Sequence, residues 1–177
     1  MATRDGSPGE AGQRPRARVE IRPATVDDVP LVLRFIRELA EYEHLADQVV
    51  ATEDVLRETL FGVVPRAEVV FAMMDGSAAG FALFFHDYST FLGRLGLYLE
   101  DLYVRPELRS RGIGSALLAH LAHLAIERGC GRLEWSVLDW NEPALAFYRS
   151  IGAQPVQGWT VHRLDGDALA KLAAGNE

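Results

Sequence analysis

Apolar and polar residues alternate along several short stretches of the chain, and this period of two predicts β-strands. Successive side chains of a strand point to opposite faces, so the alternation is typical of strands with one buried face. The predicted strands cover residues 18–22, 68–74, 80–88, 97–104, 133–137 and 159–164. The second and third of these flank a turn at Asp75 and Gly76, which predicts an antiparallel hairpin.

Other stretches repeat apolar residues at the helical spacing of three and four. Helices are predicted from Thr25 or Asp27 to about residue 42, from Thr52 to about residue 60, over 114–128, from Asn141 to Gly152, and near 167–173. Pro30 is tolerated only in a first helical turn, which favours Asp27 as the first cap. A hairpin followed by strand, helix, strand and helix predicts an α/β fold with a mixed central sheet flanked by helices.

Length and composition set outer limits on the protein. Its 177 residues are enough for a single domain, predicted over residues 18–174, while residues 1–17 are predicted to form a disordered tail. The net charge of −7 argues against a nucleic-acid surface. No apolar run is long enough to span a membrane, and Cys130 is the single cysteine. A cytoplasmic protein without disulfides is therefore expected.

The chemistry is concentrated where the strand 97–104 leads into the helix 114–128. The intervening turn contains Arg109, Arg111, Gly112 and Gly114. The first backbone N–H groups of a helix have no acceptor within the helix, and the helix dipole is positive at this end. Such a turn, framed by two arginines, predicts a site for an anion such as a pyrophosphate.

Three kinds of phosphate-binding turn can be compared with this segment. A P-loop requires a lysine after its last glycine, whereas Ser115 follows Gly114 in this chain. A dinucleotide fingerprint requires a third glycine where this chain has Leu117. The remaining pattern, R-x-x-G-x-G between a strand and a helix, resembles the acetyl-CoA loop of the GNAT acyltransferases.

The resemblance extends along nearly the whole folded chain. Six blocks occur in register with the diamine (spermidine/spermine) N-acetyltransferases and the related thialysine N-acetyltransferases. These blocks are residues 22–25, 36–40, 98–101, 112–115, 139–143 and 147–153. Residues 88–90 and 137–141 are more similar to the thialysine branch. The resemblance implies a GNAT fold, acetyl-CoA as co-substrate and a homodimer.

The resemblance also implies which residues hold acetyl-CoA. The pantetheine arm is expected along the main chain of the strand, and the pyrophosphate on the backbone of the turn, assisted by the two arginine side chains. The expected cofactor-binding residues are Leu102, Val104, Arg109, Ser110, Arg111, Gly112, Ile113, Gly114, Ser115 and Asn141. Arg111 falls at a variable position of the pattern. Asn141 is alternatively only a helix cap.

Acetyl transfer to an amine needs a proton acceptor for the ammonium and a proton donor for the departing thiolate. The resemblance nominates Glu100 as the acceptor, through water, and Tyr148 as the donor. Glu100 and Asp101 would face opposite sides of a regular strand, although a bulge would upset that count. Each carboxylate is alternatively the partner of a structural arginine. A proton relay through His86 or Asp101 is left open.

For the acceptor, the resemblance implies that Glu43 and Glu100 attract the cationic amine and that Trp159 lines its channel. A solvated surface for Glu43 and a core position for Trp159 are the alternatives. No metal is expected, because His120 and His123, three residues apart on one predicted helix, are interpreted as solvent-facing. The sequence thus predicts an acetyl-CoA-dependent N-acetyltransferase acting on a small cationic amine by direct attack in a ternary complex. An enzyme acetylating a protein Lys or N-terminus, or a non-catalytic acetyl-CoA-binding module, is the alternative.

Overall fold

The structure, a computed structural model, describes residues 18–175. They form two compact units, one up to Ser136 and one from Val137 onward. The tail predicted over residues 1–17 lies outside the described residues, so that prediction is not tested. None of the described helices is long and apolar enough to cross a membrane.

The first unit is built on a mixed five-stranded sheet. Its strands are β1 (Glu20–Pro23), β2 (Glu68–Met74), β3 (Ser77–Ser89), β4 (Arg94–Val104) and β5 (Leu133–Trp135). They lie side by side in sequence order; the first three pairs are antiparallel, and β4 pairs with β5 in parallel. The predicted hairpin is confirmed, with Asp75 and Gly76 both at positive φ in its turn. The strand predicted over residues 133–137 is shorter in the structure, because β5 ends at Trp135.

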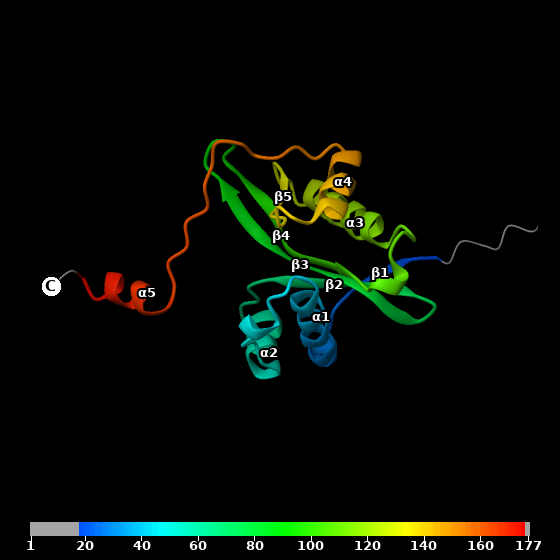
Figure 1. The fold of residues 1–177 in the computed structure, drawn as a ribbon, viewed down its shortest axis with the longest axis horizontal. Coiled ribbons are helices and arrows are strands. Elements are labelled where there is room, and N and C mark those ends of the chain that lie inside the picture. Colours follow the sequence, from blue (N-terminus) through cyan, green and yellow to red (C-terminus); the bar gives the residue numbers. More distant parts are fainter. Residues whose placement is uncertain (1–17, 176–177) are drawn as a thin grey trace, which may run out of the picture. The chain divides into compact units, whose positions relative to one another are not determined.

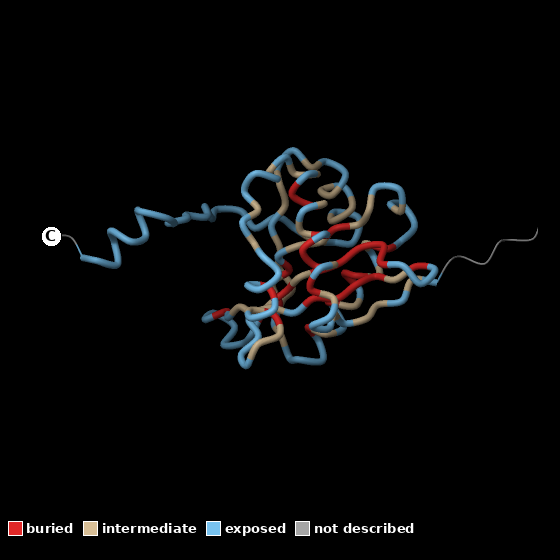
Figure 2. The backbone as a smooth tube through the Cα atoms, turned by 90° about the horizontal axis from the view of Figure 1, so that it is seen from below, coloured by how far each residue is buried: buried red, intermediate tan, exposed pale blue. Residues whose placement is uncertain are grey.

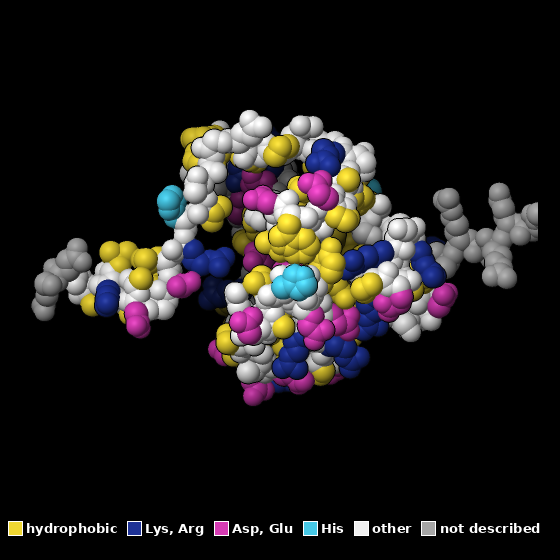
Figure 3. All heavy atoms as spheres, viewed as in Figure 1, with side chains coloured by type: hydrophobic (Ala, Val, Ile, Leu, Met, Phe, Trp, Pro, Cys, Tyr) yellow, Lys and Arg dark blue, Asp and Glu magenta, His cyan; other side chains and the backbone are white. Residues whose placement is uncertain are grey.

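Helices cover both faces of this sheet (Figure 1). The helices α1 (Val29–Tyr42) and α2 (Glu53–Phe61) lie on one face, and α3 (Ile113–Glu127) lies on the other. Short 3-10 turns occur at Val26–Asp28, Ala46–Gln48 and Pro106–Leu108. Acidic and basic side chains intermingle over the outer surface of α1 and α2 (Figure 3), as expected for a face in water.

The start of α1 differs from the prediction. The chain first forms the 3-10 turn, for which Thr25 is the N-cap, and α1 then begins after Asp28 rather than after Asp27. Asp28 fixes this geometry, because its carboxylate accepts from the Thr25 N–H and takes two 2.8 Å hydrogen bonds from Arg22. These contacts hold the pKa of the Asp28 carboxyl well below its usual range. The predicted N-cap of α2, Thr52, is confirmed by its hydrogen bond from the Val55 N–H.

The core lies between the helices and the middle of the sheet, where the buried segments gather (Figure 2). On the α1 face, the Phe35 ring stacks on Phe81 with centroids 5.3 Å apart and contacts Phe71 at 5.9 Å. On the α3 face, Leu117 and Leu121 are fully buried. Fully burying such a side chain stabilises a fold by roughly 1.5–3 kcal/mol. The resulting rigid sheet fixes the positions of the side chains on β3 and β4.

The second unit contains α4 (Glu142–Ser150) and α5 (Gly166–Ala173). The predicted cap is confirmed, since Asn141 accepts a hydrogen bond from the Ala144 N–H, and Gly152 follows the helix at φ +87°. The strand predicted over residues 159–164 is wrong: these residues form no regular structure. A strand requires a backbone ladder with a neighbour, and no strand within residues 18–175 pairs with this segment.

Candidate active site

The turn between β4 and α3 has the geometry that its sequence predicts. The strand ends at Val104, a 3-10 turn follows, and Gly112 adopts φ +82° as the N-cap of α3. This left-handed conformation strains any residue with a side chain, which accounts for the glycine. Ile113 is buried and anchors the helix start, while Arg111 and Ser115 are exposed. The first N–H groups of α3 thus lie next to exposed turn residues, as an anion site requires.

Arg109 ties this turn to the end of α1. Its Nε donates a 3.0 Å hydrogen bond to the carbonyl of Val104. Its guanidinium lies 4.3 Å from the ring centroid of Tyr42 and 5.9 Å from that of Tyr103. These cation–π contacts hold the side chain in place. Arg109 therefore stiffens the predicted pyrophosphate turn, a contribution that the sequence pattern did not indicate.

A β-bulge in β4 determines which way the carboxylates of Glu100 and Asp101 face. Asp101 pairs with Leu83 and Leu99 pairs with Phe84, so Glu100 is the extra residue between them. Glu100 is exposed and Asp101 is half-buried. No arginine within residues 18–175 forms an ion pair with either carboxylate, which removes the structural alternative raised for them.

Three carboxylates gather at this point. Burial raises the pKa of Asp101 to about 6, and the negative charges of Glu100 and Glu43 act in the same direction. Glu43 follows the last residue of α1 as its C-cap, and burial raises its pKa as well. A group of carboxylates that repel one another stabilises a cation placed among them. The sequence leaves the role of Asp101 open; its position beside Glu100 at the bulge and its raised pKa make it a second candidate proton acceptor.

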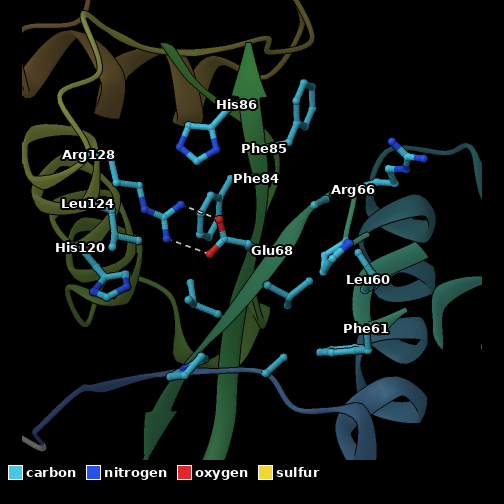
Figure 4. A pocket seen from close by; sticks show the side chains of 16 residues that line it. Leu60, Phe61, Arg66, Glu68, Phe84, Phe85, His86, His120, Leu124 and Arg128 are labelled. Atoms are coloured by element: carbon cyan, nitrogen blue, oxygen red, sulfur yellow. Dashed lines mark hydrogen bonds and ion pairs between the residues drawn. The ribbon is translucent and has the colours of Figure 1, made fainter. Parts of the chain in front are cut away.

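His86 does not belong to this group. Asp101 lies opposite Leu83 on β3, and His86 is three residues further along that strand, so it faces the other side of the sheet. There it lines a cavity of about 610 Å³ together with His120, Glu68 and Arg128 (Figure 4). In the described part of the chain, no group of three His, Cys, Asp or Glu residues is arranged to hold a metal ion.

This cavity is separate from the pyrophosphate turn. Arg128, at the end of α3, forms a two-point ion pair with Glu68 there, with distances of 2.5 and 2.9 Å (Figure 4). Gly112 stands 16 residues earlier, which corresponds to about 24 Å along a helix. The cavity contains none of the turn residues expected to hold acetyl-CoA.

The remaining predicted site residues, Asn141, Tyr148 and Trp159, belong to the second unit. Asn141 is the N-cap of α4, which is the alternative considered for it beside cofactor binding. Tyr148 is half-buried on α4, its ring centroid is 5.5 Å from that of Phe147, and burial raises the pKa of its phenol. Trp159 is exposed in the irregular segment after α4, so the core position considered for it is not observed.

Comparison with known proteins identifies the family and the fold of the chain. Residues 34–153 match the model of the acetyltransferase (GNAT) family. The chain is 42% identical to the thialysine N-epsilon-acetyltransferase of Bos taurus, over 89% of this chain and 98% of that protein. It is 34% identical to the L-ornithine N5-acetyltransferase NATA1 of Arabidopsis thaliana, over 86% of each. An integron cassette protein of V. cholerae superposes with a TM-score of 0.74 at 30% identity, over 88% of this chain and 97% of its own.

Proposed function

Because this chain belongs to the GNAT acetyltransferase family, we propose that it transfers the acetyl group of acetyl-CoA to the side-chain amine of a thialysine-like amino acid. Its general activity, acetyl-CoA-dependent N-acetylation of a small amine, follows from the family and from the relatives that share most of its length. The observation that carries the choice of a cationic acceptor is the group formed by Glu43, Glu100 and Asp101.

Acetyl-CoA is proposed to bind at the β4–α3 turn. The backbone N–H groups from Arg109 to Ser115 would receive the pyrophosphate, with help from the exposed side chain of Arg111. The main chain of β4 at Leu102 and Val104 would receive the pantetheine arm. Arg109 holds the turn in one conformation through its contacts with Val104 and Tyr42. A turn that is already rigid loses less conformational entropy when the anion binds.

The acceptor amine has to lose a proton before it can attack the thioester. An alkyl ammonium with an ordinary pKa of about 10.4 is almost fully protonated at neutral pH. We assign Glu100, exposed on the bulge, the role of holding this cation and receiving its proton through water. Asp101, with its pKa of about 6, is the neighbouring carboxylate to which that proton can pass. Glu43 adds negative charge that favours the cationic acceptor.

Tyr148 is proposed to protonate the departing thiolate of CoA. Its phenol has an ordinary pKa of about 10, which burial raises further, so it is protonated at neutral pH, the state that a general acid needs. Trp159 is proposed for the acceptor channel, where an aromatic face suits an ammonium or an alkyl chain. The amine attacks the thioester carbon, the C–S bond breaks, and the thiolate takes the proton of Tyr148.

Three further points of this proposal come from the family resemblance and the composition. A homodimer is expected, and its mass in solution can be measured by light scattering. The reaction is proposed to proceed without a metal ion, so EDTA should leave its rate unchanged. A cytoplasmic location is proposed on the single Cys130.

A thiol-release assay with acetyl-CoA tests the proposed activity. Thialysine, lysine and ornithine should be acetylated with higher kcat/KM than putrescine, spermidine or spermine. A preference for the polyamines would contradict the proposed acceptor while leaving the N-acetyltransferase activity intact. No turnover with any amine, with acetyl-CoA still bound, would instead favour a protein acceptor or a silent acetyl-CoA-binding module.

A further inference from the structure

A charged group of three side chains lies on the same face of the sheet as Asp101. Arg132 Nη2 donates a 2.6 Å hydrogen bond to Asp87 Oδ2, and Arg132 Nε lies 2.6 Å from Glu134 Oε2. All three side chains are partly exposed, by 34% for Arg132, 24% for Asp87 and 32% for Glu134. We name these residues the Arg132 cluster. Its formal charge is −1, with one cation between two anions.

Gly96 makes this cluster possible. Asp87 lies on β3 opposite Gly96 on β4, and Arg132 directly precedes β5 on the other side of Gly96. A Cβ on Gly96 would lie only 2.0 Å from Asp87 Oδ1 and 3.2 Å from Arg132 Cγ. The two charged side chains therefore meet over a strand position that has no side chain. Asp87 Oδ1 and Arg132 Nε are both buried without a hydrogen-bond partner among the described residues. Buried polar atoms left unsatisfied in this way cost stability.

The pairing of β3 with β4 places this cluster and Asp101 in separate rows of one sheet face. Asp87 lies opposite Gly96, and four residues earlier on β3 Leu83 lies opposite Asp101. Residues four apart on a strand share a face and are separated by about 13 Å. Between the two rows, Phe85 lies opposite Tyr98, with ring centroids 5.3 Å apart. This pair forms an apolar surface between two charged groups.

The backbone separation of the two rows is comparable to the length of a thialysine-like acceptor. About six bonds separate its reacting amine nitrogen from its carboxyl carbon, which corresponds to about 8 Å in an extended chain. A hydrogen bond of about 2.8 Å at each end brings the span to roughly 13–14 Å between protein atoms. The apolar middle of such a molecule would lie over Phe85 and Tyr98.

The charges of the cluster also match the far end of this molecule. An amino acid carries its α-ammonium and α-carboxylate on one carbon, so it needs an anion and a cation side by side. The guanidinium of Arg132 has five N–H donors. Its Nη2 donates to Asp87, whereas Nε, although 2.6 Å from Glu134 Oε2, is buried without a hydrogen-bond partner among the described residues. Asp87 and Glu134 place negative charge beside it. A diamine or polyamine carries no carboxylate and has no use for the guanidinium.

We propose that Arg132, held between Asp87 and Glu134, recognises the α-carboxylate of an amino-acid acceptor whose reacting amine lies at Glu100 and Asp101. This inference rests on the proposed function and adds the residue that selects amino acids over diamines. The two neighbouring carboxylates face the α-ammonium. Arg132 is thus a specificity-determining residue on the same sheet face as the proton acceptors.

The test compares thialysine with bis(2-aminoethyl) sulfide, which is the same molecule without its carboxylate. Arg132→Gln should lower kcat/KM for thialysine by about 10- to 100-fold, the usual effect of losing a charge-assisted hydrogen bond. It should change kcat/KM for the sulfide by less than about threefold. Arg132→Lys, which keeps the charge but not the planar donor set, should give a smaller loss that is again confined to thialysine.

Arg128→Gln is the matched control, because Arg128 also pairs with a carboxylate at the sheet but lies at the cavity of Figure 4. It should leave both acceptors unaffected. Equal losses for both acceptors in Arg132→Gln, or no loss for either, would overturn the proposed recognition and leave Arg132 as a brace between strands. If the unaltered enzyme acetylates neither acceptor, the proposed function itself fails. Calorimetric binding of thialysine to the unaltered and Arg132→Gln proteins then decides the recognition separately, with equal affinities counting against it.

Discussion

The guanidinium of Arg109 lies 4.3 Å from the ring centroid of Tyr42, and this contact joins the β4–α3 turn to the last residue of α1. Glu43, the next residue after Tyr42, contributes to the carboxylate group around Asp101. One side chain therefore links the turn proposed to hold acetyl-CoA to the helix end proposed to attract the amine. Changes at Arg109 are expected to act first on the turn.

Arg109→Ala should raise KM for acetyl-CoA by about 5- to 30-fold, because the turn loses one hydrogen bond and a cation–π contact. KM for the amine should change much less. Steady-state kinetics with each substrate varied in turn measure both constants. Arg57→Ala, which removes an exposed ion-paired arginine from α2, is the control. A rise confined to KM for the amine would refute the assignment of Arg109 to the acetyl-CoA turn.

Tyr148→Phe removes the proposed proton donor and keeps the ring. It should lower kcat by roughly ten- to a thousandfold, the usual range for a lost general acid. Acetyl-CoA affinity, measured by calorimetry, should stay within about threefold. The adjacent Phe147→Leu is a control for altered packing of α4, since the two rings are in contact. An unchanged kcat across the pH range would remove Tyr148 from the mechanism.

Asp101 should make the protein less stable as the pH rises from about 4 to about 6. Its pKa is about 6 in the folded chain, against an ordinary value of 3.8, so over this interval the folded state binds more protons than the unfolded state. A difference of about two pKa units corresponds to about 3 kcal/mol once the carboxylate is fully ionised. Asp101→Asn should therefore raise the free energy of unfolding at pH 8 by about 1–3 kcal/mol and have little effect at pH 4. Urea unfolding at the two pH values checks this; equal effects at both would contradict the burial of this carboxylate.

The same substitution should alter the pH dependence of the reaction. If Asp101 accepts the proton that leaves Glu100, kcat/KM should fall below pH 6 in the unaltered enzyme. Asp101→Asn should lower kcat/KM at pH 8 by about 10- to 100-fold and flatten that acid limb. The control is Glu107→Gln, which alters an exposed carboxylate away from Glu43, Glu100 and Asp101. It should leave the pH dependence of kcat/KM unchanged. An acid limb that persists unchanged in Asp101→Asn would assign it to another group.

Gly96→Ala should separate Asp87 from Arg132. The added Cβ would lie 2.0 Å from Asp87 Oδ1, so the Asp87 side chain must move. The loss in free energy of unfolding is expected at about 1–3 kcal/mol, the range for overpacking at a buried position. In a double-mutant cycle measured by urea unfolding, Asp87→Ala should remove most of the added cost of Gly96→Ala. Strictly additive losses would show that the two residues do not interfere.

Most strands, the helices and the geometry of the β4–α3 turn follow from local patterns, because alternation, capping residues and glycine spacing are recorded in neighbouring residues. Thr52, Asn141 and Gly112 occupy the positions that these patterns predict. The raised pKa of Asp101 did not follow, since it depends on burial and on Glu43, 58 residues earlier in the chain. The Arg132 cluster also depends on register across three strands, and Gly96 in β4 was its one local signal.

The strand predicted over residues 159–164 shows the opposite error. Its alternation satisfies the local requirement for a strand, but alternation does not supply a pairing partner. The favoured first cap, Asp27, was wrong for a related reason, whereas the alternative, Thr25, is the N-cap of the 3-10 turn that precedes α1. Asp28 is fixed by Arg22 as well as by Thr25, and an ion pair between side chains six residues apart is not part of a capping pattern.

The measurement that tests the central claim most directly is the ratio of kcat/KM for thialysine to that for spermidine, obtained by thiol release from acetyl-CoA at pH 8. Acetylation of a thialysine-like amino acid predicts a ratio well above one, by about tenfold or more if one charge-assisted contact to the carboxylate is made. A ratio below one would show that the acceptor site selects polyamines and would contradict the proposed amino-acid substrate.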